Sequence, residues 1–495
     1  MRLLLLCMAA VILCLVGVIQ AAPTTNATTT SEYSEALSFT NRTLWNIISS
    51  SILTLFACIY SAVHPNIPSP KDSLFRILWR RLGIMIMALI APELIVTWAM
   101  RQWISARHVT KRFKKSGYFN VPRLQTQSEN HELAGVLAGP VGDDNRAQPL
   151  VAPAEVSTSR YGGTRVLAKP FKKLFEACIS DQSEDYAWTQ THSFFVLMGG
   201  FMLYVDGEPY RTLLPDDVLK LIPKGCIDAP TLTAKRIRDK SKGNVISKGL
   251  MILQVVWFIL QLITRAIYHL ETTQLETGTL AFAVLNFLTY AVWWNKPLDV
   301  QCPHPVYWKS TESKPEDHID AVSEDDSDED ERTMYKIIGA AIVPFVELMG
   351  FGFPPRKLRV PTFDGSIELE KSDKRFLIFA GILMATTFGG IHCMAWFFTF
   401  PTNHEQVLWR MSAVAITCTP CLEILWYEMN VNGAILVNYT MTIMPAIVIM
   451  FLCVVALIIF ALLYITSRAM LLVLMVTTLR NLPVDAYTTA FVPHL

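Results

Sequence analysis

The chain has 495 residues, of which 52% are hydrophobic and only 17% are charged, with a net charge of +1 and a mean hydropathy of +0.34. Soluble domains carry about 25% charged residues, so this composition argues against an ordinary soluble protein. The near-zero net charge gives no reason to expect nucleic-acid binding. The ten cysteines do not suggest a disulfide framework, because half of them lie in apolar stretches, where free Cys behaves as a small hydrophobe.

The N-terminus has the pattern of a secretory signal. Residues 1–22 comprise a short basic start, an apolar stretch and a small-residue exit, which predicts a signal peptide or an uncleaved signal anchor. Residues 23–43 should then be lumenal. This segment holds two sequons, beginning at Asn26 and Asn41, and we expect both to be glycosylated. The predicted location is the membrane of the endoplasmic reticulum or a later secretory compartment.

Long apolar stretches predict several membrane crossings, since a spanning helix needs about 20 mostly apolar residues. Two shorter, Gly-bearing blocks at 192–205 and 337–353 are expected to be re-entrant or interfacial. The fold class is therefore an all-α polytopic transmembrane helix bundle. The stretches that approach spanning length are 44–63, 82–100, 245–268, 277–294, 376–400, 408–427 and 438–465.

Hydrophilic inserts divide the chain. Residues 44–116 form a first membrane region, 117–190 a polar insert expected to be disordered, and 191–300 a membrane region with a small cytoplasmic cap at 206–248. An acidic insert at 301–335 holds ten acidic residues between Glu316 and Glu331, and we expect it to be disordered too. Residues 336–495 form the C-terminal membrane region.

Basic residues indicate the orientation of the first region. Residues 101–115 interleave Arg and Lys with apolar side chains, which is typical of a stretch at an anionic lipid surface on the cytoplasmic side. The bases between Lys71 and Arg81 require the same side. Both are satisfied if 82–100, interrupted at Pro92-Glu93, enters and leaves through one face of the bilayer. A true crossing remains open.

Several short strings recur in a known group of proteins. They are His64-Pro65-Asn66-Ile67-Pro68, Pro92-Glu93-Leu94 with Arg101-Gln102, Thr191-His192-Ser193-Phe194-Phe195, Trp293-Trp294-Asn295-Lys296-Pro297-Leu298, Phe388-Gly389-Gly390-Ile391-His392-Cys393-Met394-Ala395-Trp396 and Leu408-Trp409-Arg410. From about residue 45 to the C-terminus, the chain resembles a family of uncharacterised fungal polytopic membrane proteins. The resemblance implies source and topology and no particular activity.

Ionisable residues inside apolar spans are the candidates for chemistry, because a charge at the centre of a bilayer costs roughly 2.5–3.5 kcal/mol on insertion scales. Here they are Glu93, Glu347, His392, Glu423 and Arg265, and the first four are the candidate site residues. We expect His392 and Glu347 to share one intramembrane site, in which a neutral His acts as base or ligand. No ligand spacing indicates a particular metal or cofactor. The alternative is that each residue satisfies a broken-helix backbone or another buried polar group.

Three function classes follow. The first is a membrane-embedded enzyme acting on a hydrophobic, lipid or isoprenoid-like small molecule. The second is a transporter or channel lined by the same residues. The third is a non-catalytic scaffold or sensor whose cytoplasmic segments bind partners. A pocket open to lipid would favour the enzyme, whereas a path across the bilayer would favour transport.

Overall fold

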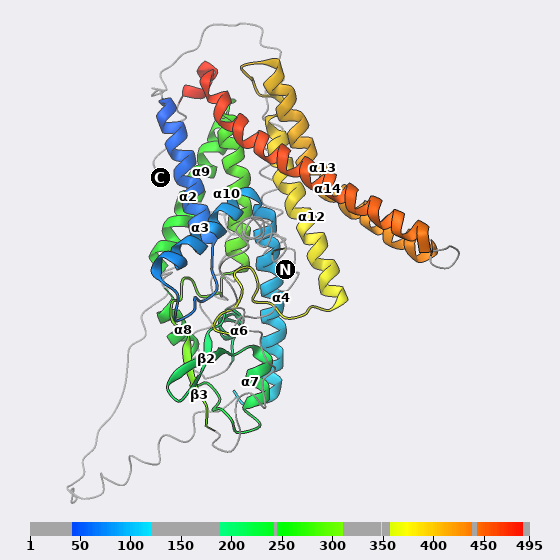
Figure 1. Cartoon of the computed structure of the whole chain (residues 1–495). Helices are drawn as coiled ribbons and strands as arrows, with labels where there is room; N and C mark the ends of the chain where they lie inside the picture. Colours follow the sequence, from blue (N-terminus) through cyan, green and yellow to red (C-terminus); the bar gives the residue numbers. More distant parts are fainter. Residues whose placement is uncertain are drawn as a thin grey trace, which may run out of the picture.

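The computed structural model describes residues 42–119, 188–241, 245–309, 348, 357–437 and 443–488. It consists of a bundle of long helices with a smaller folded unit at one end (Figure 1). We call this unit, comprising residues 188–241 and 300–309, the cap. Glu347 and both sequon asparagines lie outside the described residues, so the predictions made for them stay predictions.

Four described helices are long and apolar enough to cross a membrane: Leu44–Ala62, Gln274–Val292, Lys371–Phe397 and Ile458–Arg480. They correspond to α2 (Leu44–Ala62), α10 (Gln274–Val292), α12 (Lys371–Cys393) with the 3-10 turn η2 (Met394–Phe397), and the C-terminal part of α14 (Ile443–Thr477) with η3 (Thr478–Arg480). A shorter apolar stretch, Met251–Ile267, belongs to α9 (Val245–Ile267). The prediction of an integral membrane protein is therefore supported in its general form.

Helix α10 is the centre of the bundle. Its span window is 83% buried, against 28–39% for the other three, and it packs against α2, α4, α12 and α14. The helix begins with a capping box, in which the Thr273 side chain accepts from the backbone of Glu276 and the Glu276 carboxyl accepts from the backbone of Thr273. Along its length it carries the buried polar side chains Thr277, Thr279, Asn286 and Thr289. Small and polar side chains in a membrane helix favour contact with other helices over contact with lipid, which explains its central place.

Helices α3 (Leu74–Ile90) and α4 (Pro92–Ser116) form a broken pair, bent by 114°. Proline suits the first turn of a helix and ends a preceding one, so the bend falls at Ala91-Pro92. Near both ends of the pair, an arginine forms an ion pair with a residue in or next to the cap. Arg81 pairs with Asp299 at 3.1 Å, and Arg112 pairs with Asp216. This geometry favours entry and exit through one face over a true crossing.

The described residues are mostly helical, as the all-α prediction requires, but the cap also contains a small sheet that the sequence did not predict. Strand β1 (Phe201–Val205) pairs antiparallel with β2 (Glu208–Thr212) and parallel with β3 (His304–Tyr307). The β1–β2 turn is made by Asp206 and Gly207, both with positive φ, the conformation that a tight hairpin needs. Short helices complete the cap: α6 (Gln190–Leu197), α7 (Pro215–Leu221) and α8 (Ala234–Lys240).

The apolar block at 192–205 forms α6 and β1 of the cap, where its Phe194, Phe195 and Phe201 are fully buried. The re-entrant or interfacial placement expected for it is therefore corrected, and the described part of the cap includes residues 188–205, which precede the predicted start at residue 206. The period of an apolar run does not distinguish a cap core from a membrane segment, which is why the sequence misplaced it.

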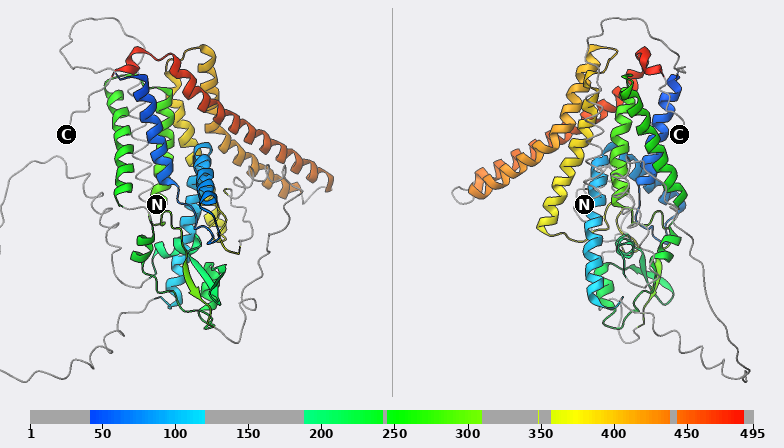
Figure 2. Two further views of the ribbon diagram at one scale, coloured as in Figure 1. Left: turned by 60° about the vertical axis from the view of Figure 1, so that its left-hand side comes forward. Right: turned by 180° about the vertical axis from the view of Figure 1, so that it is seen from behind.

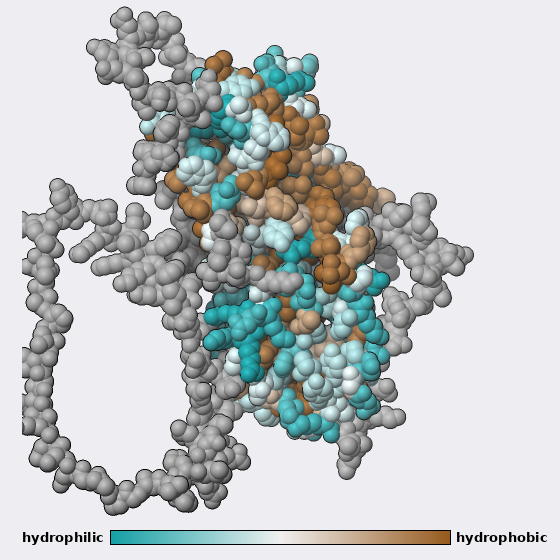
Figure 3. Space-filling model, turned by 90° about the vertical axis from the view of Figure 1, so that its left-hand side faces the viewer, coloured by the Kyte–Doolittle hydropathy of each residue, from teal (hydrophilic) through white to brown (hydrophobic). Residues whose placement is uncertain are grey.

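Helices α13 (Asn403–Val437) and α14 leave the bundle together as a long antiparallel pair (Figure 2). A last turn, η4 (Val484–Tyr487), returns to the start of α2, where Arg42 donates its backbone N–H to the Tyr487 carbonyl at 2.7 Å. On the surface, hydrophobic residues gather over the helices and hydrophilic residues cover the cap (Figure 3). Such a division is expected of helices in lipid and a cap in water.

Candidate functional site

Glu93 is the second residue of α4 and is buried immediately after the break. The Tyr464 hydroxyl of α14 donates to its Oε1 at 2.7 Å, and Arg468 Nη2 lies 3.9 Å from its Oε2. The two α14 residues are one helical turn apart, so they present their polar ends to the same neighbour. The structure therefore couples the candidate Glu93 to a tyrosine and an arginine far along the chain.

Arg468 also closes the helix break. Its Nε and Nη2 donate to the Ile90 carbonyl at 3.0 and 2.7 Å. This carbonyl belongs to the last turn of α3, whose carbonyls lack helical partners because α3 ends at Ala91-Pro92. The guanidinium carbon lies 3.9 Å from the centre of the Phe388 ring, which adds a cation–π contact. Arg468 thus joins α3, α4 and α12.

His392 is fully buried in α12, four residues after Phe388. Its Nδ1 lies 2.8 Å from the Phe388 carbonyl oxygen, so Nδ1 carries the proton and donates. Nε2 is then an acceptor, and it has no hydrogen-bond partner among the described residues. The indole N–H of Trp409 on α13 donates to the backbone carbonyl of His392 at 3.1 Å, which holds α13 against this part of α12.

The structure relates two of the four candidate residues. Phe388 contacts the Arg468 guanidinium on one side and the His392 ring, at 4.6 Å between centres, on the other, so Glu93 and His392 belong to one packed region. The expected pairing of His392 with Glu347 is untested, because Glu347 is not described. For Glu423 the structure describes only its backbone, within α13.

A further buried polar residue with several partners, Lys296, is one that the sequence analysis did not select. Lys296 follows α10 and is 2% exposed. Its ammonium donates to the His64 carbonyl at 2.6 Å and to Gln102 Oε1 at 2.9 Å, and lies 3.4 Å from Asn66 Oδ1. The rings of Trp293 and Trp98 lie 4.4 and 5.1 Å from its nitrogen. Burial lowers the pKa of Lys296 well below 10.5.

We call Lys296 and its partners His64, Asn66 and Gln102 the lysine centre. An extended segment, residues 357–370, packs over this centre, and we call the segment the strap. The side chains of Asn66, Trp98 and Gln102 all donate to the Asp364 carbonyl, at 3.0, 3.2 and 2.5 Å. The next residue, Gly365, has φ +96°, and a Cβ there would lie 2.8 Å from Gln102 Nε2. The strap therefore needs a glycine at this point.

Three of the strings that carry the family resemblance meet at the lysine centre: His64–Pro68, Arg101-Gln102 and the Trp293–Leu298 string. Their signal in the sequence was a polar residue at the edge of an apolar stretch, flanked by Pro or Trp. The strap supplies backbone carbonyls, which no residue pattern reveals. Sequence reasoning could therefore have selected Lys296, but it could not have found its contacts.

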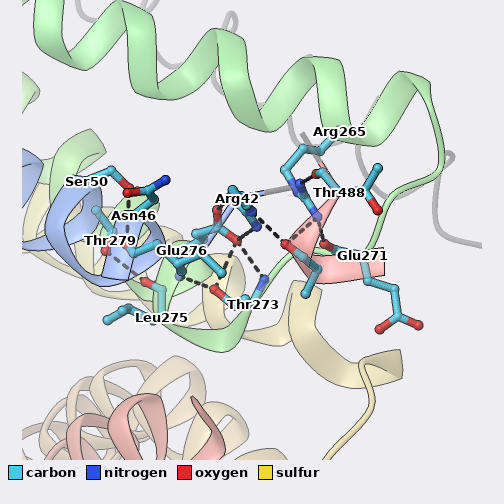
Figure 4. A network of polar contacts seen from close by, with 12 residues as sticks. Arg42, Asn46, Ser50, Arg265, Glu271, Thr273, Leu275, Glu276, Thr279 and Thr488 are labelled. Carbon is cyan, nitrogen blue, oxygen red and sulfur yellow. Dashed lines mark hydrogen bonds and ion pairs between the residues drawn. The ribbon is translucent and has the colours of Figure 1, made fainter. Parts of the chain in front are cut away.

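A second polar network lies at the opposite end of the bundle (Figure 4). Arg42 Nη1 lies 2.6 Å from Glu276 Oε1, and Arg42 Nε donates to the Ala486 carbonyl at 2.6 Å. Arg265 at the end of α9 donates to the Thr488 and Asp485 carbonyls at 2.7 and 3.0 Å. This network, which we call the terminal clamp, ties the starts of α2 and α10 and the end of α9 to residues 485–488.

In the part of the chain that the structure describes, no group of three or more His, Cys, Asp or Glu side chains is placed to hold a metal ion. Residues 101–115 have their apolar side chains, Ile104, Val109 and Phe113, buried. Arg101 is buried as well, so only the later bases, Arg107, Lys111, Arg112, Lys114 and Lys115, are exposed to an anionic surface. Binding to lipid there stays a prediction.

No curated protein and no solved structure matches the chain. A family model of unknown function, DUF8562, matches residues 11–134 and 171–321, which is more than half of the chain. The match includes α2 to α4, the described cap and the lysine string after α10, whereas the strap lies outside it. That the family is fungal stays a prediction. The chain belongs to this family of unknown function, DUF8562.

Proposed function

We propose that this protein is a multi-pass membrane protein of the secretory pathway that acts without catalysis, as a scaffold holding the cap at the cytoplasmic surface. One observation carries the proposal. Two of the buried polar groups that could serve chemistry, Glu93 and Lys296, connect distant segments of the chain. Glu93 and Arg468 close the α3–α4 break, and Lys296 joins two loops to α4.

The cap is held firmly enough for such a role. Arg101 donates to the Phe363 carbonyl of the strap at 2.8 Å, and the strap residue Lys357 accepts at its carbonyl from the Thr212 backbone of β2 at 2.9 Å. A continuous path of hydrogen bonds thus leads from α4 through the strap to the sheet. A rigid connection of this kind fixes the direction in which the cap surface faces.

The cap end carries exposed bases. Lys111 and Lys115 lie on the last turns of α4, and Lys235, Arg236 and Arg238 lie on α8. The α4 bases lie at the end of that helix farthest from the membrane helices (Figure 1). This placement favours an acidic protein partner over the bilayer as the ligand of that surface, because a screened charge acts over only about 8–10 Å.

The second candidate function is a membrane-embedded enzyme acting on a hydrophobic lipid-like substrate. One observation favours it. His392 Nε2 is a buried acceptor without a described hydrogen-bond partner, and a catalytic role is one of the explanations for an unsatisfied buried group in a native protein. In this reading His392 is the base, and Glu93, Glu347 and Glu423 supply the remaining polarity.

Complementation of a null mutant of the source organism separates the two. Each variant is first shown to reach normal abundance and to elute as a single species from a sizing column. If the scaffold proposal holds, His392→Met restores the parental phenotype, whereas the surface variant Lys111→Glu/Lys115→Glu does not. A folded His392→Met protein that fails, together with a surface variant that succeeds, would favour the enzyme and refute the scaffold.

A further inference from the structure

Helices α2, α9 and α10 meet the cap at a common level. A buried cluster that includes Cys58, Met251 and Tyr290 joins the last turns of α2 and α10 to the start of the apolar stretch of α9. The nearby side chains of Tyr60 and Trp294 are 45% and 39% exposed. Aromatic side chains of this kind are enriched where a membrane meets water. We therefore place the cap-side boundary of the membrane at the ends of α2 and α10.

Helix α8 lies next to this boundary, on the side of the cap that adjoins the membrane helices (Figure 1). Its C-cap, Ser241, is tied to the segment that follows α10: Ser241 Oγ donates to the Leu298 carbonyl at 3.0 Å and accepts from the Leu298 N–H at 2.9 Å. Helix α9 begins shortly afterwards at Val245, and Met251 lies about 9 Å further along its axis. The last turn of α8 is therefore held close to the level of the lipid headgroups.

The start of α8 is anchored to the core of the cap. His192 Nδ1 accepts from the Thr189 backbone N–H at 3.1 Å, so the proton is on Nε2, which donates to the Leu232 carbonyl at 2.7 Å. The Thr233 side chain then caps the helix, and Ile237 is fully buried. Because both ends are fixed and Ile237 faces inward, the charged side chains of this short helix are directed outward.

The outward face of α8 is basic. Three of its bases, two exposed and one half-buried, form no ion pair with another described residue: Lys235, Arg236 and Lys240. Asp239 on the same helix is exposed, so it offsets one of these charges. Asp299, next to Leu298, is already in an ion pair with Arg81. Burial lowers the pKa of His304 on β3, and the charges of the α8 bases lower it further, so their positive potential extends to the neighbouring strand.

We propose that α8 binds the headgroups of anionic phospholipids at the cytoplasmic face of the membrane, through Lys235, Arg236 and Lys240. Bases beside the cytoplasmic end of a membrane helix are attracted to anionic lipid, and the attraction fades within a Debye length of about 8–10 Å. The place of α8 at the boundary suits this short range, whereas the bases at the end of α4 lie at the far end of the cap. The site rests on the cytoplasmic placement of the cap in the proposed function, but not on the partner surface at the end of α4.

Binding is measured by native mass spectrometry of the full chain in a neutral detergent. The probes are dioleoyl phosphatidylserine and dioleoyl phosphatidylcholine, which differ in the net charge of the headgroup. We expect phosphatidylserine to bind about tenfold more tightly or better at low salt, because each base near the surface adds to the attraction. The preference should weaken as the ionic strength is raised, because exposed charges are screened. No preference for phosphatidylserine would overturn the proposal.

The variant Lys235→Gln/Arg236→Gln/Lys240→Gln should lose most of this preference. Its matched control, Lys111→Gln/Lys115→Gln/Lys220→Gln, removes the same charge from exposed positions on α4 and α7 and should keep the parental preference. A preference that is lost in the control and kept in the α8 variant would place the lipid surface on α4 and overturn the assignment to α8.

Hydrogen exchange of the parental protein in nanodiscs tests the site without any variant. The amides of residues 234–241 should exchange more slowly in nanodiscs that contain phosphatidylserine than in phosphatidylcholine alone. The competing ligand is the acidic segment of this chain between Glu316 and Glu331. Equal protection of α8 in both kinds of nanodisc, lost when residues 312–332 are deleted, would assign α8 to that segment and refute the lipid site. None of these measurements uses complementation, so a failure here is distinguishable from a failure of the scaffold proposal.

Discussion

Removal of the Arg468 guanidinium should destabilise the bundle strongly. Arg468→Met keeps most of the side-chain volume but removes the two hydrogen bonds to Ile90, at 3.0 and 2.7 Å, and the ion pair to Glu93 at 3.9 Å. Hydrogen bonds from charged groups contribute about 1.5–3 kcal/mol, and breaking a buried pair on one side costs about 3–5 kcal/mol. We expect the free energy of unfolding to fall by about 3–5 kcal/mol.

A double variant separates the two parts of this loss. Arg468→Met/Glu93→Gln also removes the buried acid, while the glutamine oxygen can still accept from Tyr464. Only the orphaned Ile90 carbonyl then remains, which costs about 1–3 kcal/mol. The double variant should therefore be more stable than Arg468→Met alone. The interaction energy between the two positions follows from the complete double-mutant cycle.

The assay is reversible unfolding in mixed detergent micelles, followed by tryptophan fluorescence. Arg480→Met is the matched control. Arg480 pairs with Glu405 at 2.8 Å, but its side chain is 58% exposed, and exposed pairs contribute about 0–1 kcal/mol. The reasoning fails if Arg468→Met costs no more than Arg480→Met, or if the double variant is no more stable than Arg468→Met.

Three further predictions concern the strap, the lysine centre and the lumenal segment. Gly365→Ala should lower the free energy of unfolding by about 1–3 kcal/mol, because the residue has φ +96° and little space for a Cβ. Its control is Gly83→Ala in α3, where a Cβ would meet nothing within 4 Å; this variant should be neutral or stabilising in the same unfolding assay. Burial lowers the pKa of Lys296, so between that lowered pKa and 10.5 the unfolded chain binds more protons than the folded chain does. The free energy of unfolding should therefore rise with pH across this window. Lys296→Met should flatten the rise, and melting curves of both proteins from neutral pH to about 10 would expose the error if their slopes were equal. Endoglycosidase should increase the gel mobility of the parent expressed in a secretory host, and Asn26→Gln/Asn41→Gln should abolish that shift, because both sequons lie in the segment that we expect to be lumenal. A shift that persists in the double variant would contradict this.

The sequence by itself determined the membrane character, the approximate positions of several spans and the break in the second one. Apolar length is a local property that the bilayer thickness imposes, and a proline in the middle of an apolar stretch, such as Pro92, favours a kink or a break there. The terminal Ser or Thr caps of α2 and α3 are equally local, since Thr43 and Ser73 each accept from a backbone N–H three residues on. These features could be predicted because each depends on neighbours in the chain.

Only the tertiary structure decided which polar residues meet. Glu93 contacts residues of α14 that lie 371 positions away or more, and Lys296 reaches a carbonyl 232 positions back. A single sequence carries no record of such distances, and an intramembrane glutamate looks the same whether it awaits a substrate or holds an arginine. The cap was misplaced for a similar reason, because a buried helix and strand can be as apolar as a membrane segment. What the polar residues do follows from their partners, and the partners are set by how the helices pack.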